Sequence, residues 1–185
     1  MIADIKKDAE QRMHKTVDAL KDELKRMRTG RAHAGLLESV RVEYYGTQVP
    51  IKQTANITVE DARTLVVTPW EKQIVSAVEK AILNSGLGLN PVTAGTVIRV
   101  PLPPMTEERR KELVKVVRHS AETGRVAVRA ARREALADVK DLLKEKLITE
   151  DEERKAEVET QKLTDKYIAQ VDALLKEKEA EIMEV

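Results

Sequence analysis

The sequence contains no cysteine and no phenylalanine, and aromatic residues make up only 2% of its 185 residues. Without cysteine, the chain cannot form a disulfide, a thiolate zinc site or a cysteine nucleophile. So few rings also disfavour a stacking platform for single-stranded nucleic acid. No stretch approaches the roughly 20 apolar residues of a membrane-spanning helix, and Met1-Ile2-Ala3-Asp4 lacks the apolar run of a secretion signal. We expect a soluble, cytoplasmic protein.

Signatures of catalysis are also sparse. The three histidines are scattered, no serine lies in a nucleophile elbow, and Gly86-Leu87-Gly88 is not followed by the Lys-Ser/Thr pair of a phosphate loop. The acidic run at residues 150–153 occupies the expected first turn of a helix, where acids stabilise the helix dipole without a metal. We therefore predict no enzyme activity, no catalytic residue, no metal site and no cofactor.

Three segments show the three- and four-residue spacing of apolar positions that is typical of packed helices. They span residues 2–28, 106–147 and 149–182, and Thr149 with Glu152 forms a capping-box pattern at the start of the last one. Helices with one narrow apolar stripe are stable only when they bury their stripes together. We predict a long three-helix bundle. The apolar seam predicted for the second helix is Leu113, Val117, Ser120, Gly124, Val128, Ala131, Ala135, Val139 and Leu142, and that for the third is Ala156, Leu163, Tyr167, Val171, Leu174 and Ile182.

The middle of the chain has a different character. Strand-like alternation marks residues 40–44, 53–59, 65–67 and 97–100, Gly46-Thr47 reads as a turn, and helical spacing runs over residues 74–82. The predicted class is α+β. Residues 1–30 and 105–185 form the bundle, and residues 31–104 form a small inserted β/α/β domain.

Two segments of chain cross the predicted boundary between bundle and insert. Hinges are expected near residues 29–32 and 101–105, because glycine on one side and prolines on the other constrain the direction of motion. Reorientation is the default expectation for domains with small interfaces. The predicted hinge residues are Thr29, Gly30, Pro101, Leu102, Pro103 and Pro104.

The most informative surface feature is a run of arginines on the second predicted helix. At about 3.6 residues per turn, Arg118, Arg129 and Arg132 fall on the same helix face as Arg125, away from the apolar seam. Arginine binds phosphate through paired hydrogen bonds. We interpret this face as one continuous, solvent-facing basic ridge, joined by Arg133 at its edge, that contacts an RNA backbone in a salt-dependent way.

A less specific interpretation of the ridge is a solvated surface whose arginines pair with the third helix. Residues 106–148 hold 12 Lys and Arg against 8 Asp and Glu, whereas residues 149–185 hold 6 against 12. Two observations argue against internal pairing. The central run is entirely arginine, the residue that binds phosphate through paired hydrogen bonds, and a mixture of Glu and Lys would have solvated the face equally well. A second basic cluster, Lys25-Arg26-Met27-Arg28-Thr29-Gly30-Arg31, follows the first helix, where cations also favour the helix dipole.

Seven segments, in order and along the whole chain, resemble the bacterial ribosome recycling factor family. They are Arg28-Thr29-Gly30-Arg31-Ala32, Val42-Glu43-Tyr44-Tyr45-Gly46, Ala77-Val78-Glu79-Lys80-Ala81-Ile82, Leu87-Gly88-Leu89-Asn90-Pro91, Ile98-Arg99-Val100-Pro101-Leu102-Pro103-Pro104, Thr106-Glu107-Glu108-Arg109-Arg110-Lys111 and Gln161-Lys162-Leu163-Thr164-Asp165. A long ordered set of this kind is specific to one family.

The resemblance implies an L-shaped, two-domain monomer that binds the ribosome after termination and splits its subunits together with elongation factor G and GTP. It implies that the bundle contacts large-subunit RNA and that the insert faces elongation factor G. The family's critical RNA-contacting arginine falls on Arg132, with Arg129, Arg133 and Arg125 beside it. Arg28 and Arg31 also look like RNA contacts.

The alternative function is a helical scaffold that docks other proteins while its arginines pair internally. Salt dependence separates the two hypotheses. Binding to RNA weakens steeply with salt, because phosphate neutralisation releases counterions, whereas binding through an apolar surface does not.

Overall fold

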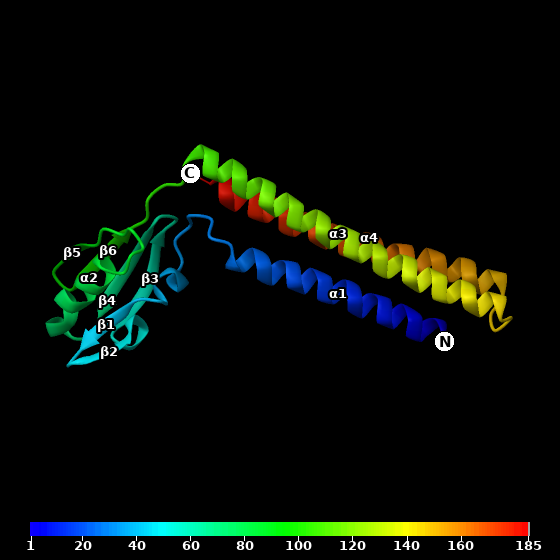
Figure 1. Ribbon diagram of the computed structural model, residues 1–185, viewed down its shortest axis with the longest axis horizontal. Coiled ribbons are helices and arrows are strands. Elements are labelled where there is room, and N and C mark those ends of the chain that lie inside the picture. The colour runs from blue at the N-terminus through cyan, green and yellow to red at the C-terminus, as the bar shows by residue number, and fades with distance from the viewer. Residues whose placement is uncertain (185) are drawn as a thin grey trace. The chain divides into compact units, whose positions relative to one another are not determined.

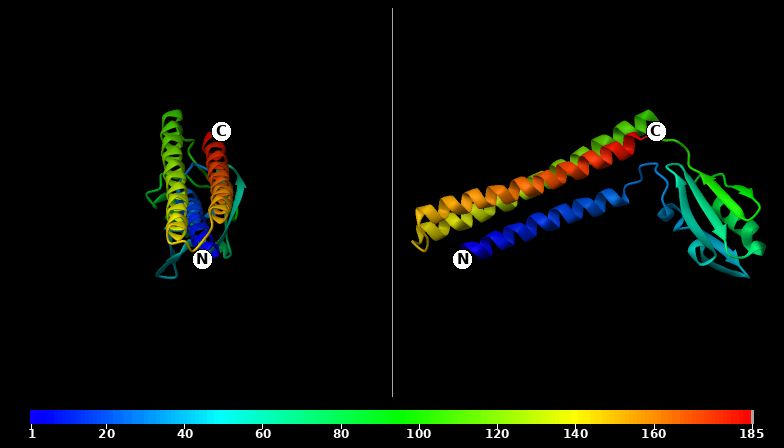
Figure 2. Two further views of the ribbon diagram at one scale, coloured as in Figure 1. Left: turned by 90° about the vertical axis from the view of Figure 1, so that its right-hand side faces the viewer. Right: turned by 180° about the vertical axis from the view of Figure 1, so that it is seen from behind.

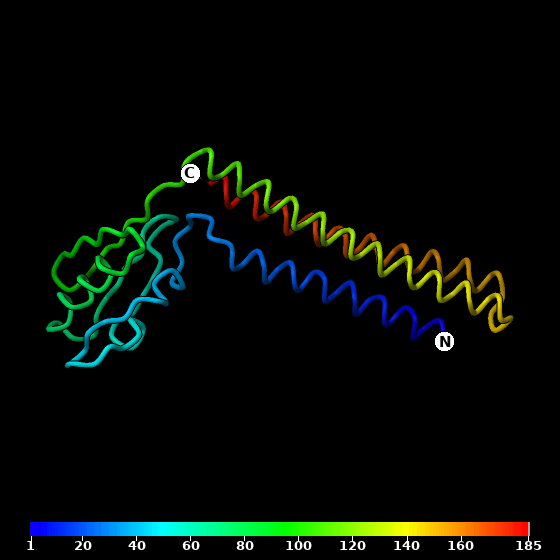
Figure 3. The backbone as a smooth tube through the Cα atoms, viewed as in Figure 1, coloured from blue at the N-terminus to red at the C-terminus, as the bar shows by residue number. Residues whose placement is uncertain are grey.

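The structure, a computed structural model, describes residues 1–184. The described chain divides into two compact units. One unit comprises Met1–Arg28 with Glu107–Glu184, and the other comprises Thr29–Thr106. Figure 3 traces the path: the chain runs through one helix of the first unit, makes the whole second unit, and returns for the two long helices.

The first unit is a three-helix bundle built from α1 (Ile2–Arg26), α3 (Glu107–Lys144) and α4 (Glu150–Met183) (Figure 1). The helix α3 runs antiparallel to both partners, and all three pack side by side when seen along the bundle in the left panel of Figure 2. At about 1.5 Å per residue, the 38 residues of α3 extend for about 57 Å. The predicted bundle is confirmed.

The bundle core follows the predicted stripes with local differences. Its buried residues are Ala9, Met13, Val17, Leu20 and Leu24 of α1, Leu113, Val117, Ala121, Gly124, Val128, Ala131, Ala135 and Val139 of α3, and Ala156, Thr160, Thr164, Tyr167, Val171, Lys178 and Ile182 of α4. Ala121 replaces the predicted Ser120, whose hydroxyl donates to Glu23 at 2.8 Å.

Two threonines in the core of α4 were missed because their type suggests the surface. The Thr160 hydroxyl donates to the Ala156 carbonyl at 2.7 Å, and the Thr164 hydroxyl donates to the Thr160 carbonyl at 2.9 Å. Burial of these hydroxyls is tolerated because each has a hydrogen-bond partner in the preceding turn of its own helix.

The turn between α3 and α4 is fixed on both sides. At the end of α3, the Leu147 N–H donates to the Leu142 carbonyl at 2.9 Å, and the Lys146 N–H donates to the Leu143 carbonyl at 3.0 Å, with Lys146 at φ 60°. This pair of bonds is the Schellman helix ending. At the start of α4, the predicted capping box is confirmed, since Thr149 and Glu152 each accept a hydrogen bond from the other's backbone N–H.

The second unit combines two antiparallel sheets with one helix. The strands β1 (Arg41–Tyr44) and β2 (Thr47–Pro50) form a hairpin, and a four-stranded sheet has the order β3-β4-β6-β5 (Figure 1). Its strands are β3 (Ala55–Asp61), β4 (Thr64–Pro69), β5 (Val92–Ala94) and β6 (Val97–Pro101), and the helix is α2 (Val75–Leu83). Short 3-10 helices cover Ala34–Leu37, Ile51–Gln53 and Lys72–Ile74.

The core of this unit contains side chains from both sheets and the helix, among them the fully buried Val42, Leu65, Val78 and Ile98. The strands β2 and β5 were not predicted, because neither short segment alternates clearly between apolar and polar residues. The hairpin turn lies at Tyr45-Gly46 rather than at Gly46-Thr47. Both turn residues have positive φ, 49° and 83°, as a two-residue type I′ turn requires.

Part of the predicted hinge is fastened to the insert. Pro101 ends β6 opposite Thr64, and the Leu102 N–H donates to the Arg63 carbonyl at 2.7 Å. These hydrogen bonds make Pro101 and Leu102 part of the folded insert and correct their assignment as pivots. Within residues 1–184, no helix is both long and apolar enough to cross a membrane.

Candidate nucleic-acid interface

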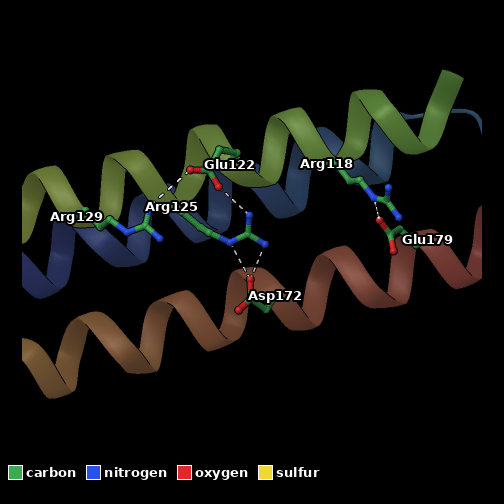
Figure 4. Close-up of polar contacts among 6 residues, drawn as sticks. All are labelled: Arg118, Glu122, Arg125, Arg129, Asp172 and Glu179. Carbon is green, nitrogen blue, oxygen red and sulfur yellow. Dashed lines mark hydrogen bonds and ion pairs between the residues drawn. The ribbon is translucent and has the colours of Figure 1, made fainter.

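Arg118 and Arg125 of α3 reach across to α4, and each pairs with an acid of that helix (Figure 4). The Arg118 Nε donates to Glu179 at 2.6 Å. Arg125 donates to Asp172 through Nε at 2.8 Å and through a terminal nitrogen at 2.6 Å, and to Glu122 at 2.9 Å. The Arg125 side chain is only 19% exposed. Its hydrogen bond to Asp172 is the main cause that raises its pKa, although burial opposes the rise.

The predicted continuous, unpaired ridge is therefore wrong over the stretch that contains Arg118 and Arg125. Their partners in α4 lie 61 and 47 positions away in the sequence, beyond the local i±4 neighbours that the prediction considered. For these two arginines the alternative interpretation, pairing with acids of the third helix of the bundle, is confirmed. They contribute little net positive charge to the surface.

Arg129 and Arg133 lie further along α3 and are more available. Among residues 1–184, Arg129 pairs only with Glu122, at 3.5 Å, and its side chain is 44% exposed. Because Glu122 also binds Arg125, the charge of Arg129 is only partly balanced. Arg133 is exposed, and it forms no hydrogen bond or ion pair with any residue in the described part of the chain.

Arg132 is held by a neutral side chain instead of an acid. One terminal nitrogen donates to the Gln161 side-chain oxygen at 2.8 Å, and the Gln161 side-chain nitrogen donates to Asp165 at 2.8 Å. Within residues 1–184, Arg132 forms no ion pair, and its Nε is buried without a hydrogen-bond partner. Such a buried donor is uncommon in a native structure. The guanidinium is thus oriented, keeps its charge, and retains donors for a phosphate.

The remaining predicted basic residues flank the boundary between the units. Arg28, at the end of the bundle's first segment, is exposed and forms no ion pair or hydrogen bond with the described residues. Arg31 is exposed and belongs to the other unit.

A groove between α1 and α4 was missed, because its lysines on α1 lie more than 150 positions from those on α4. Its lining includes Lys6, Lys7, Lys162 and Lys166. Lys6 pairs with Glu159, and Lys166 lies 3.7 Å from Glu10. The packing of α1 beside α4 brings these residues together, and no sequence pattern within one segment could have predicted it.

Among residues 1–184, no group of three or more His, Cys, Asp or Glu side chains is placed to hold a metal ion. The arrangement on α3 offers directed hydrogen-bond donors with positive charge. This chemistry serves the binding of an anionic backbone.

Comparison with known proteins gives a consistent match. The family model described as ribosome recycling factor matches residues 20–183. Proteins named ribosome-recycling factor from Legionella pneumophila (strain Paris) and Halorhodospira halophila are 60% and 63% identical to this chain, and each alignment covers all of both chains.

Two solved structures are also similar at 47% sequence identity. A solution structure of the ribosome recycling factor matches with a TM-score of 0.69, covering 100% of this chain and 98% of the other. The T. thermophilus ribosome recycling factor, described with E. coli elongation factor G on the E. coli post-termination complex, matches with a TM-score of 0.62 over 100% of both chains. The family match, the full-length relatives and the shared two-unit fold lead to one conclusion: this chain belongs to the ribosome recycling factor family.

Proposed function

We propose that this protein recycles ribosomes after translation termination. It binds the post-termination ribosome and, together with elongation factor G and GTP, splits the subunits so that they can be used again. Support comes from the full-length relatives, which carry the name ribosome-recycling factor, and from the related factor described on a post-termination complex with elongation factor G.

The observation that carries the RNA-binding part of this proposal is the state of Arg132. Its guanidinium is oriented by Gln161 but remains without an acidic partner in the described chain. Together with Arg129 and Arg133, it forms the Arg132 patch, a short cationic surface on one side of α3. Phosphate contacts from such a patch position a protein on RNA without reading its sequence.

The structure gives less support for RNA contacts by three other arginines, Arg125, Arg28 and Arg31. Arg125 already makes three hydrogen bonds to acids, so a phosphate would have to displace Asp172 or Glu122. Arg28 and Arg31 are exposed and could extend the contact at the end of the bundle that leads into the insert.

The bundle would therefore anchor the protein on large-subunit RNA, while the insert of residues 31–104 would face elongation factor G. The proposed pivots are Thr29 and Gly30 on one crossing and Pro103 and Pro104 on the other. Pro101 and Leu102 are excluded because their backbones are tied to the insert. Hinges of this kind absorb a change of direction in a few residues.

In this mechanism the protein supplies position and mechanical coupling, and the partner supplies the free energy of GTP hydrolysis. We propose that it acts in the cytoplasm as a monomer, without a cofactor or a chemical step of its own.

The test is subunit splitting of purified post-termination ribosomes, followed by light scattering, with and without elongation factor G and GTP. Splitting should require all three components, and Arg132→Ala should bind large subunits more weakly with a smaller dependence on salt. If folded Arg132→Ala binds at full strength, the RNA anchor is wrong. Binding that is insensitive to salt would instead favour the protein-docking scaffold.

A further inference from the structure

Two of the four aromatic residues in this chain are neighbours in the β1–β2 hairpin and converge on one carboxylate. The Tyr44 hydroxyl donates to one oxygen of Glu71 at 2.7 Å, and the Tyr45 hydroxyl donates to the other oxygen at 2.7 Å. The two rings meet edge to face, with centroids 4.6 Å apart. The side chains of Tyr44, Tyr45 and Glu71, which we call the Tyr45–Glu71 site, therefore have fixed positions.

The carboxylate of this site accepts hydrogen bonds from two hydroxyls. The hydrogen bonds from Tyr45 and Tyr44 lower the pKa of Glu71, so it stays ionised to a more acidic pH. Within residues 1–184, Glu71 forms no ion pair. Each carboxylate oxygen has a free lone pair after accepting one hydroxyl. An oriented anion with spare acceptor capacity lies next to a tyrosine that is 68% exposed.

Local stability gives a poor explanation for a tyrosine at position 45. Its φ of 49° lies in the left-handed region, which bulky side chains rarely adopt and which the first position of a type I′ turn requires. Asparagine, aspartate or glycine would meet this requirement with less strain. Tyr44 also ties the hairpin to Glu71, so this attachment does not depend on Tyr45 alone. Strained residues with exposed side chains are characteristic of binding sites.

We propose that the Tyr45–Glu71 site binds an arginine or lysine side chain of a protein partner. The cation would pair with the free lone pairs of Glu71 and lie against the exposed face of Tyr45, which adds a cation–π attraction. RNA is the less suitable partner, because the ionised carboxylate repels phosphate. Tyrosine and arginine are both enriched among the residues that dominate protein interfaces.

This inference rests on the proposed function, since it assigns the contact to elongation factor G, the partner that the insert is proposed to face. The Tyr45–Glu71 site lies in the insert, whereas the Arg132 patch lies in the bundle. The two proposals can therefore fail separately.

The test uses the full chain with Tyr45→Asn and Glu71→Gln, together with Val92→Thr as a control at an exposed position on β5. Subunit splitting is measured against factor concentration in the presence of elongation factor G and GTP, and thermal unfolding is measured in parallel. We expect both site variants to need about tenfold more factor for half-maximal splitting, as for the loss of one good interface contact. The control should match the wild type.

Thermal unfolding separates binding from a purely structural role. Relief of backbone strain should offset the lost hydrogen bond to Glu71, so Tyr45→Asn should be about as stable as the wild type even though it splits ribosomes less well. A lower melting temperature for Tyr45→Asn, or splitting by Glu71→Gln at wild-type concentrations, overturns the inference. If the site variants instead bind protein-free ribosomal RNA more weakly, the occupant is RNA and the inference is wrong. Failure of the wild-type protein to split ribosomes would contradict the proposed function itself.

Discussion

The side-chain oxygen of Gln161 accepts a hydrogen bond from Arg132 at 2.8 Å, whereas Arg118 and Arg125, earlier on α3, pair with carboxylates of α4. A neutral acceptor fixes the direction of the guanidinium and leaves its charge uncompensated. This difference of one side chain separates the available part of the arginine row from the part that is paired internally.

Gln161→Glu should convert Arg132 into another internal ion pair. The shape is conserved, so the bundle should remain folded, but large-subunit binding should weaken. The slope of log binding constant against log salt should fall by about 0.7–0.9, the contribution of one phosphate contact. Filter binding over a range of salt concentrations measures this slope.

The matched control is Gln170→Glu, which adds the same charge nine positions further along α4. It should leave the salt slope close to that of the wild type. Equal losses in the two variants would mean that net charge, and not the contact with Arg132, governs binding.

Asp172→Asn should have the opposite effect on binding, because it releases Arg125 from its carboxylate partner. We expect a steeper salt dependence and tighter binding to ribosomal RNA. Asp172 is more than half exposed, so the cost in stability should be modest, about 0.5–1 kcal/mol. Urea unfolding measures the cost, and unchanged RNA binding would show that Arg125 lies outside the interface.

Glu71 predicts a pH dependence of stability. Its pKa is lowered in the folded state, chiefly by the hydrogen bond from Tyr45 and then by that from Tyr44. A lowered carboxyl pKa contributes stability that is present above the unfolded value of 4.5 and is lost as pH falls through the lower, folded value. The stability difference between wild type and Glu71→Gln should therefore shrink in acid. A difference that stays constant from neutral to acidic pH in urea titrations would contradict this linkage.

Gly124→Ala should stabilise the bundle. A Cβ at this position would lie 3.7 Å from Leu20 and 3.8 Å from Val171, which are ordinary van der Waals distances. Alanine also favours the helix over glycine by about 0.5–1 kcal/mol. Thermal unfolding should show a higher midpoint. Gly30→Ala is the contrasting variant, because φ is 79° and its Cβ would meet Met105 at 3.1 Å, so it should lower the midpoint.

The long helices and their buried faces could be predicted because each carries a sustained apolar period and, at Thr149, a cap. Short strands could not, since Thr47–Pro50 and Val92–Ala94 are held by pairing with a neighbour rather than by a pattern of their own. For the site, residue type identified the arginines, and the resemblance singled out Arg132. Their partners could not be foreseen, because whether Arg125 meets Asp172 depends on the register of two helices.

That register is set at the turn between α3 and α4. Hydrogen bonds fix the backbone of this turn at both ends, through the Schellman pair at Lys146 and Leu147 and the capping box at Thr149. The two helices are therefore held in one register. One residue added there would shift the facing positions by about 1.5 Å along the helix and turn them by about 100°. Gln161 would then no longer face Arg132. The connection of residues 145–149 thus sets the register of the two helices, and its length decides which arginine keeps an unpaired charge.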